Sequence, residues 1–209
     1  MNLAVYLTFV GTSLLLALAP GPDNLFVLAQ SATCGAKSGL AVVAGLITGL
    51  VCQTLAAAMG IAAVVAATPW LFWAVRLVGA AYLVYLAVGA WRAGASEAHA
   101  GTVAGNAPSM AALWRRGVIM NVTNPKVQIF FLAFFPQFVT PGADGLQTVT
   151  EMVILGVTFM AATAVVFGSI ALFAGSIADR LRTPKVQMLL NRASAVLFVL
   201  LAVGTVAAL

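Results

Sequence analysis

The chain has 209 residues, of which 63% are hydrophobic and 7% are charged. Apolar stretches of this extent exclude a soluble globular domain and indicate an integral membrane protein that forms one transmembrane domain over residues 1–209. The net charge of +5 is carried mostly by short connectors, so we interpret it as a signal of membrane topology. It does not indicate nucleic acid as a partner.

Six hydrophobic segments are long enough to cross a bilayer, since a transmembrane helix takes about 20 apolar residues. We therefore predict an all-α fold with six transmembrane helices embedded in the lipid bilayer. The spans cover residues 3–31, 38–65, 69–91, 117–139, 148–177 and 188–209. The polar stretch 92–116 is the longest connector, and we interpret it as a cytoplasmic linker between two three-helix halves, residues 3–91 and 117–209.

A helix-breaking motif interrupts the first span. It consists of Pro20, Gly21, Pro22, Asp23 and Asn24. Each proline lacks a backbone N–H and crowds the carbonyl one turn earlier, so the carbonyls of Leu16 and Leu18 lose their helical partners. Asp23 and Asn24 lie where a second half-helix would begin, and such a start favours a negative group such as a substrate carboxylate. The alternative is a kinked helix with Asp23 serving only as its cap.

The second span carries glycines on one helical face, together with Ser38 and Gln53. These glycines are Gly35, Gly39, Gly45, Gly49 and Gly60. Small residues let helices approach closely in lipid, so we expect this face to pack against neighbouring spans. The alternative is a face between two copies, which would make the protein a homo-oligomer.

A second motif, Asn124-Pro125-Lys126, interrupts the fourth span. Pro125 frees the carbonyl of Asn121 for the same reason as the prolines of the first span. Broken helices at membrane depth are tolerated only where they are packed in protein or line a wet cavity. Interrupted segments in corresponding positions of two halves are the best sequence indication of a transport site.

Three charged side chains are expected inside the spans. An isolated charge at the centre of a span costs about 2.5 to 3.5 kcal/mol on insertion scales, so Asp23 and Lys126 should face a partner or a cavity. We expect them to be in contact, either as an ion pair that opens when the carboxylate and amine of a substrate compete for it or as a fixed structural salt bridge. Arg76 lies nearer the outer boundary of the third span, where it either reaches the headgroups or forms part of an outer gate.

The two halves have corresponding breaks. Aligning Pro22 with Pro125 places Asp23 opposite Lys126, each near the middle of the first span of its half. An odd number of crossings in each half turns the second half upside down relative to the first. We therefore predict an inverted repeat of two three-helix units with broken first helices.

Basic residues lie in alternate connectors, which predicts the orientation in the membrane. They are Lys37 in the first connector, Arg92, Arg115 and Arg116 in the third, and Arg180, Arg182, Lys185 and Arg192 in the fifth. The second and fourth connectors contain none. Since basic connectors stay in the cytoplasm, both termini are predicted to be periplasmic.

The motifs of both broken spans resemble those of the LysE/RhtB family of bacterial amino-acid exporters. The first runs from Pro20-Gly21-Pro22-Asp23-Asn24 through Gly35, Gly39, Gly45 and Gly49, and the second from Asn124-Pro125-Lys126 to Pro136-Gln137-Phe138. The resemblance implies export of amino acids or close derivatives across the bacterial inner membrane, driven by protons. Many family members have Asn where this chain has Asp23, a difference that bears on the coupling ion. Asp23 is also the one credible carboxyl for a coupled proton.

Other functions find less support in the sequence. His99 is the only histidine, and no Ser-His-Asp, metal-binding or phosphate-binding pattern is present, so we predict neither an enzyme nor a metal or other cofactor. A scaffold subunit would have little reason to bury Asp23, Lys126 and two helix breaks. A passive channel is the remaining alternative function, because it would also need polar groups at membrane depth.

Overall fold

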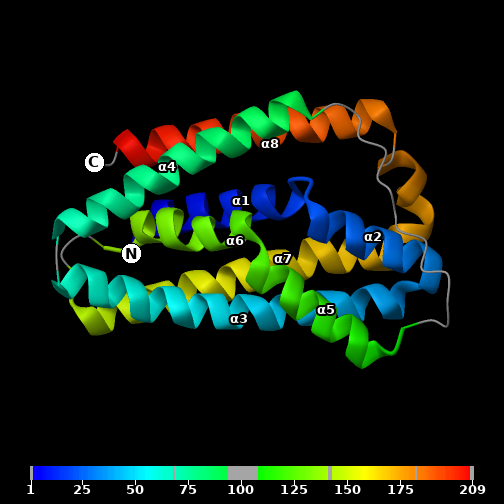
Figure 1. Ribbon diagram of the computed structural model, residues 1–209, viewed down its shortest axis with the longest axis horizontal. Helices are drawn as coiled ribbons and strands as arrows, with labels where there is room; N and C mark the ends of the chain where they lie inside the picture. The colour runs from blue at the N-terminus through cyan, green and yellow to red at the C-terminus, as the bar shows by residue number, and fades with distance from the viewer. Residues whose placement is uncertain (1, 68, 94–107, 141–142, 182, 208–209) are drawn as a thin grey trace.

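The computed structural model describes residues 2–67, 69–93, 108–140, 143–181 and 183–207 (Figure 1). Within these ranges, the side chains left undescribed are those of 61–67, 69–73, 75–76, 133, 177–181 and 207. Every regular element of the described chain is a helix, so the all-α prediction is confirmed.

Ten helical elements follow one another along the described chain. They are α1 (Leu3–Leu18), α2 (Pro22–Cys34), α3 (Ala36–Ala67), α4 (Pro69–Arg92), α5 (Met110–Thr123), α6 (Pro125–Ile129), the π-helical turn η1 (Phe130–Phe134), the 3-10 turn η2 (Phe135–Phe138), α7 (Gly145–Leu181) and α8 (Pro184–Ala207). The helix α5 begins earlier than the predicted fourth span, because the Ser109 side chain caps it by accepting from the Ala112 N–H at 3.2 Å. The end of the predicted linker is therefore helical.

Three helices of the described chain are long and apolar enough to cross a membrane. They cover Ala36–Gly60 in α3, Gly145–Ser176 in α7 and Pro184–Val206 in α8. Two bent pairs also pass the same test together, α1 with α2 at 59° and α5 with the segment Pro125–Phe138 at 51°. Both predicted spans with proline breaks are thus broken helices. The described part of α4 contributes a shorter apolar helix, Leu77–Arg92, so the count of six spans stays a prediction.

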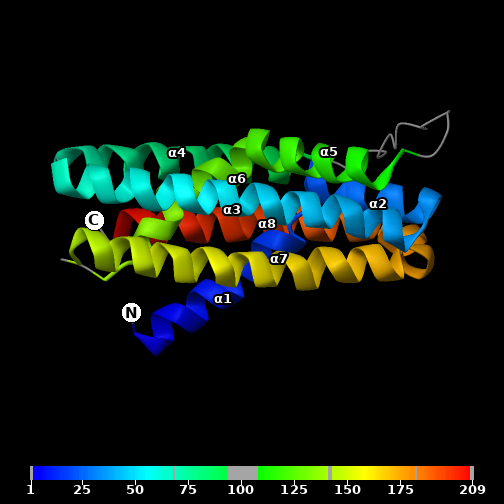
Figure 2. The same ribbon diagram turned by 90° about the horizontal axis from the view of Figure 1, so that it is seen from below.

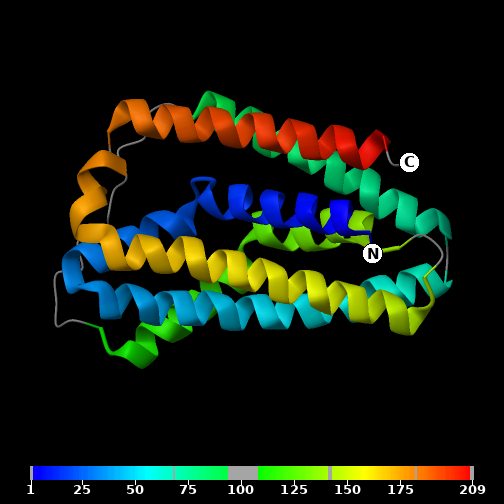
Figure 3. The same cartoon turned by 180° about the vertical axis from the view of Figure 1, so that it is seen from behind.

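The helices form an elongated bundle with α1 and α6 in its middle (Figure 1). The α4–α8 pair lies on one side, and α3 packs against both α5 and α7 on the other. Figure 3 shows α1 between α8 and α7, and Figure 2 shows its N-terminal part slanting away from the bundle. Both chain ends lie at one end of the bundle, whereas the α2–α3 and α7–α8 links lie at the other. This arrangement is compatible with the inverted repeat, which stays a prediction.

Phenylalanines fill the half of the bundle nearer the chain ends. This aromatic cluster consists of Phe9, Phe130, Phe131, Phe134, Phe135, Phe138 and Phe159. The Phe9 ring of α1 meets Phe135 and Phe138 edge-on at 5.1 and 5.0 Å between ring centres. The backbone here departs from an α-helix because Pro136 has no N–H, and the Phe135 N–H bonds the Phe130 carbonyl five residues back. Packing of large aromatic rings therefore fixes the end of the second broken helix.

Candidate substrate site at the two helix breaks

The two helix breaks meet around a small cavity in the middle of the bundle. Its volume is about 30 Å³. Five of the residues predicted from the two motifs line it, namely Gly21, Asp23, Asn24, Asn124 and Lys126. The other walls come from α1, α3, α5, α6 and α7, through Leu16, Ala17, Leu50, Asn121, Val127, Phe159, Thr163 and Phe167. The remaining motif residues, Pro20, Pro22 and Pro125, form the breaks themselves.

Lys126 of the second break binds the backbone of the first. Its Nζ donates to the Leu16 carbonyl at 3.4 Å and to the Ala19 carbonyl at 3.2 Å. The Leu16 carbonyl is the one that Pro20 leaves without a helical partner. The ammonium also lies 5.7 Å from the centre of the Phe198 ring on α8. A charged side chain from one half of the sequence therefore satisfies the broken backbone of the other.

Asp23 lies in the first turn of α2, where its carboxyl group is buried with the residue only 6% exposed. It accepts a hydrogen bond from Asn124 Nδ2 at 2.9 Å. The N-cap of α2 is Gly21, which makes no side-chain cap, so Asp23 is not the cap considered as the alternative. The first turn of a helix nevertheless favours its negative charge.

The expected direct contact between Asp23 and Lys126 is absent from the structure. No Lys126 nitrogen lies within the 4.0 Å of the Asp23 carboxyl oxygens that would define an ion pair between these two described residues. The physical reason is competition between partners. The exposed carbonyls of the first break accept hydrogen bonds from the Lys126 ammonium group, and the Asn124 amide donates one to the Asp23 carboxyl group. The opposite charges share one cavity without touching.

Amide side chains organise the second break. Asn124 caps α6, since its Oδ1 accepts from the Lys126 backbone N–H at 3.0 Å. The freed Asn121 carbonyl accepts from Gln53 Nε2 of α3 at 2.8 Å. At the first break, Asn24 Nδ2 donates to the Ala17 carbonyl at 2.7 Å. Gln53 was not predicted as a site residue, although a buried amide on the glycine face of an apolar helix was a usable signal.

The glycines of α3 occupy different environments. A Cβ added to Gly39 would overlap Ser31 of α2, one on Gly45 would overlap the Trp114 carbonyl of α5, and one on Gly49 would lie 2.7 Å from the Asn121 Cβ. These three glycines therefore let α2 and α5 approach α3 closely. Gly35 does not belong to this packing face, because nothing lies within 4 Å of an added Cβ. It instead adopts φ +84° between α2 and α3, a conformation that favours glycine. The alternative of a face between two copies is not needed to explain the other three.

Glu151 is a buried polar residue that the sequence did not single out. Its carboxylate accepts from the Thr140 N–H at 2.7 Å, from Thr140 Oγ1 at 2.8 Å and from Gln147 Nε2 at 3.2 Å. These bonds tie the segment after η2 to α7. Predicting them would have required knowing that Thr140 and α7 fold together. Arg76 was predicted near an outer gate, but its side chain lies outside the described residues.

The cavity is chemically suited to a small zwitterion but is closed. A carboxyl group, an ammonium group and three amide side chains surround it. A volume of about 30 Å³ holds one or two water molecules, not an amino acid. Binding of a substrate therefore requires the broken helices to move apart. Among the described residues, no three His, Cys, Asp or Glu side chains gather as metal ligands would.

A helical bundle with membrane-length apolar helices, in which two broken helices enclose buried charges, has the architecture of a membrane translocator. The chain belongs to the LysE type translocator family, whose model matches residues 14–208. The resemblance to LysE/RhtB exporters is thereby confirmed.

Individual relatives cover nearly the whole chain. It is 34% identical to the homoserine/homoserine lactone efflux protein of Salmonella typhimurium over 201 residues, 96% of this chain and 95% of that protein. It is 31% identical to an uncharacterized membrane protein of Vibrio cholerae over 192 residues, 92% of this chain and 91% of that protein. No solved structure matches the chain significantly.

Proposed function

We propose that this protein exports amino acids or close derivatives from the cytoplasm across the bacterial inner membrane in exchange for protons. The observation that carries the proposal is the placement of Asp23 and Lys126 in one closed cavity at the junction of two broken helices. An amino acid carries both an ammonium and a carboxylate, so this pair is complementary to it. The similarity to the homoserine/homoserine lactone efflux protein of Salmonella typhimurium supports the same substrate class.

The geometry suggests how a substrate loosens the site. The first intrahelical bond of α2 runs from the Leu25 N–H to the Gly21 carbonyl, so the N–H groups of Asp23 and Asn24 precede it. A substrate carboxylate that approached these N–H groups and Lys126 would compete with the carbonyls of α1 for the ammonium. The two half-helices would then lose the bonds that hold the first break closed.

Three buried polar atoms of the described residues have no hydrogen-bond partner, namely Ser13 Oγ, Gln30 Nε2 and Ser31 Oγ. The proposed substrate route runs past Ser13 and Gln30. Gln30 lies two helical turns beyond Asp23 on α2, and Ser13 lies one turn before the cavity residue Ala17 on α1. Leaving such atoms unpaired costs about 1 to 3 kcal/mol each, which substrate or water would offset in an open state. We place Gln30 on the inner side of the substrate route and Ser13 on its outer side.

We assign the coupled proton to Asp23, the described carboxyl group at the cavity. The decisive measurement is uphill substrate movement in reconstituted vesicles under an imposed pH gradient. Asp23→Asn should still exchange substrate across the membrane but should no longer move it against its gradient. Asp144→Asn is the matched control, because Asp144 is exposed and Asn replaces Asp well as the helix cap of α7. Gradient-driven transport by Asp23→Asn at the normal rate would remove Asp23 from the proton path.

The same vesicles separate an exporter from a passive channel. An exporter should show counterflow, in which excess unlabelled substrate on one side drives uptake of labelled substrate against its own gradient. A channel would show efflux without counterflow. Exchanging the charges as Asp23→Lys with Lys126→Asp should not restore export, because the two groups bind different partners. Restored export would instead indicate a structural ion pair.

The predicted orientation can be tested independently. Both termini lie at one end of the bundle, and the connector ends that carry Lys37, Arg92 and Lys185 lie at the other (Figure 1). Single cysteines at Gly94 and Thr183 in a cysteine-free background should be shielded from an impermeant thiol reagent added outside, while one at Gly142 should react. Reaction at Gly94 without reaction at Gly142 would reverse the orientation.

A further inference from the structure

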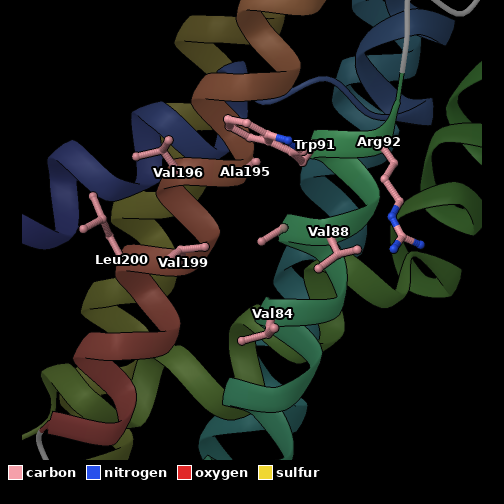
Figure 4. A pocket seen from close by; sticks show the side chains of 9 residues that line it. Val84, Val88, Trp91, Arg92, Ala195, Val196, Val199 and Leu200 are labelled. Carbon is pink, nitrogen blue, oxygen red and sulfur yellow. The ribbon is translucent and has the colours of Figure 1, made fainter.

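A second hollow lies between α4 and α8, and its walls share no residue with those of the central cavity. Figure 4 shows this α4–α8 groove, which Val84 and Val88 of α4 line together with Val196, Val199 and Leu200 of α8. Its volume is about 340 Å³ and its walls are almost entirely apolar. The wall side chains are largely exposed, with Leu200 at 63% and Val199 at 47%. In a membrane-spanning bundle these side chains face the acyl chains.

One end of the groove is aromatic and positively charged. Trp91 closes it, lying across toward α8 (Figure 4), and the Arg192 guanidinium lies 5.7 Å from the centre of the Trp91 ring. Arg92, the next residue of α4, also borders this end, although Figure 4 shows its guanidinium group pointing away from the groove. Asn191 Nδ2 donates to the Ala93 carbonyl at 3.1 Å, so this end of α4 is tied to α8. Tryptophan and arginine at the end of an apolar wall are typical of the headgroup boundary.

No described carboxylate neutralises this charge. Asp23 lies in the central cavity, and Asp144 and Glu151 lie at the opposite end of the bundle, where α7 begins. Lys185, in the first turn of α8, is a further described basic residue toward this end. An apolar groove that ends at the Arg192 guanidinium, with no described carboxylate beside it, is complementary to a molecule with an acyl chain and a negatively charged head.

We propose that the α4–α8 groove binds an anionic phospholipid. One acyl chain lies against the valines, and the phosphate lies beside Arg192, while Arg92 at the end of α4 adds positive charge from farther away. The stretch from Val84 to Trp91 is about 10 Å long, so it accommodates the part of the acyl chain next to the headgroup. Basic pockets between transmembrane helices bind anionic headgroups in this way. The site is independent of the transport cavity and of the proposed export.

The test compares phosphatidylglycerol with phosphatidylcholine on the full chain in detergent, using native mass spectrometry to count the lipids retained. Phosphatidylglycerol should be retained in preference. Arg192→Gln should lower its retention about fivefold, the effect of one basic residue near a membrane surface, and Arg92→Gln should lower it less. Arg115→Gln is the matched control, because Arg115 is an exposed basic residue on α5.

A second variant tests the acyl-chain half of the site. Val199→Trp fills the groove and should reduce retention of phosphatidylglycerol, whereas Val157→Trp on the exposed face of α7 should not. Equal retention of the two lipids, or unchanged preference in Arg192→Gln, would overturn the proposal. A dimer that dissociates in the Val199→Trp variant would also overturn the proposal, because the groove would then belong to the interface with a second copy.

Discussion

At the first helix break, one side chain from the other half of the sequence, Lys126, bonds two exposed carbonyls, whereas the second break is held mainly by residues next to it in sequence. The Leu16 and Ala19 carbonyls depend on Lys126, which lies 110 and 107 residues away in sequence. At the second break, Asn124 caps α6 and its own N–H bonds the Asn121 carbonyl at 3.1 Å. The α2 half-helix has no corresponding side-chain cap.

This difference assigns different roles to the two breaks. The second is a preorganised support that presents Asn124 and Lys126 to the cavity. The first is held by the Lys126 ammonium group, for which a substrate carboxylate would compete under the proposed function. We therefore expect the first half-helices to move during transport and the second break to keep its local structure.

The largest expected effect comes from removing the donor that closes the first break. Lys126→Met should abolish export, because the substrate carboxylate loses its cationic partner. It should also lower the free energy of unfolding by at least about 1 kcal/mol for each carbonyl left unpaired. Efflux in vesicles and denaturation in mixed micelles measure the two effects. Lys37→Met, at an exposed position, is the control; uphill export by Lys126→Met would contradict the assigned role.

A second test addresses how firmly α5 is anchored beside the second break. Gly45→Ala should lower the free energy of unfolding by about 1 to 3 kcal/mol, because the new Cβ overlaps the Trp114 carbonyl. Gly60→Ala on the same helix meets open space and should change stability by less than about 0.5 kcal/mol. Equal melting curves for the two variants would show that α5 adjusts without cost.

Asn124 should matter more than Asn24. Asn124→Ala removes the cap of α6 and the hydrogen bond to Asp23, so we expect a loss of about 1 to 2 kcal/mol in the free energy of unfolding together with impaired export. Asn24→Ala removes only the bond to the Ala17 carbonyl, for about 1 kcal/mol. Asn124→Ser separates the two roles, because serine restores the cap without reaching Asp23. Recovery of both stability and export in that variant would make the Asp23 contact dispensable.

The smallest effect is expected at Gln53. Gln53→Leu removes one of two donors to the Asn121 carbonyl, so the free energy of unfolding should fall by about 0.5 to 1 kcal/mol with export nearly unchanged. Thermal melting and initial efflux rates are the measurements. A complete loss of export in a stable variant would place Gln53 in contact with the substrate.

Sequence reasoning predicted local features and missed those that depend on docking. The breaks at Pro20 and Pro125 and the depth of Lys126 follow from the chemistry of proline and from the length of the apolar runs. The predicted partner of Lys126, the Asp23 carboxyl group, was wrong. The prediction did not consider backbone carbonyls as partners of the ammonium group. Gly35 was assigned to packing, although its positive φ gives it a turn role. The hydrogen bonds of Glu151 could not be predicted, because they depend on Thr140 lying beside α7.

The sequence by itself determined that this is an all-helical membrane protein with two broken helices and opposite charges at depth, because hydrophobic length and proline sterics act within a few residues. Only the tertiary structure decided that Asn124 binds Asp23 while the Lys126 ammonium binds carbonyls of the first break, and that the cavity is closed. Asp23 and Asn124 lie 101 residues apart, so their contact depends on how the two halves dock. In a membrane interior, a carbonyl freed by a helix break needs a hydrogen-bond donor from the protein, and the packing of the two halves decides which donor lies near it.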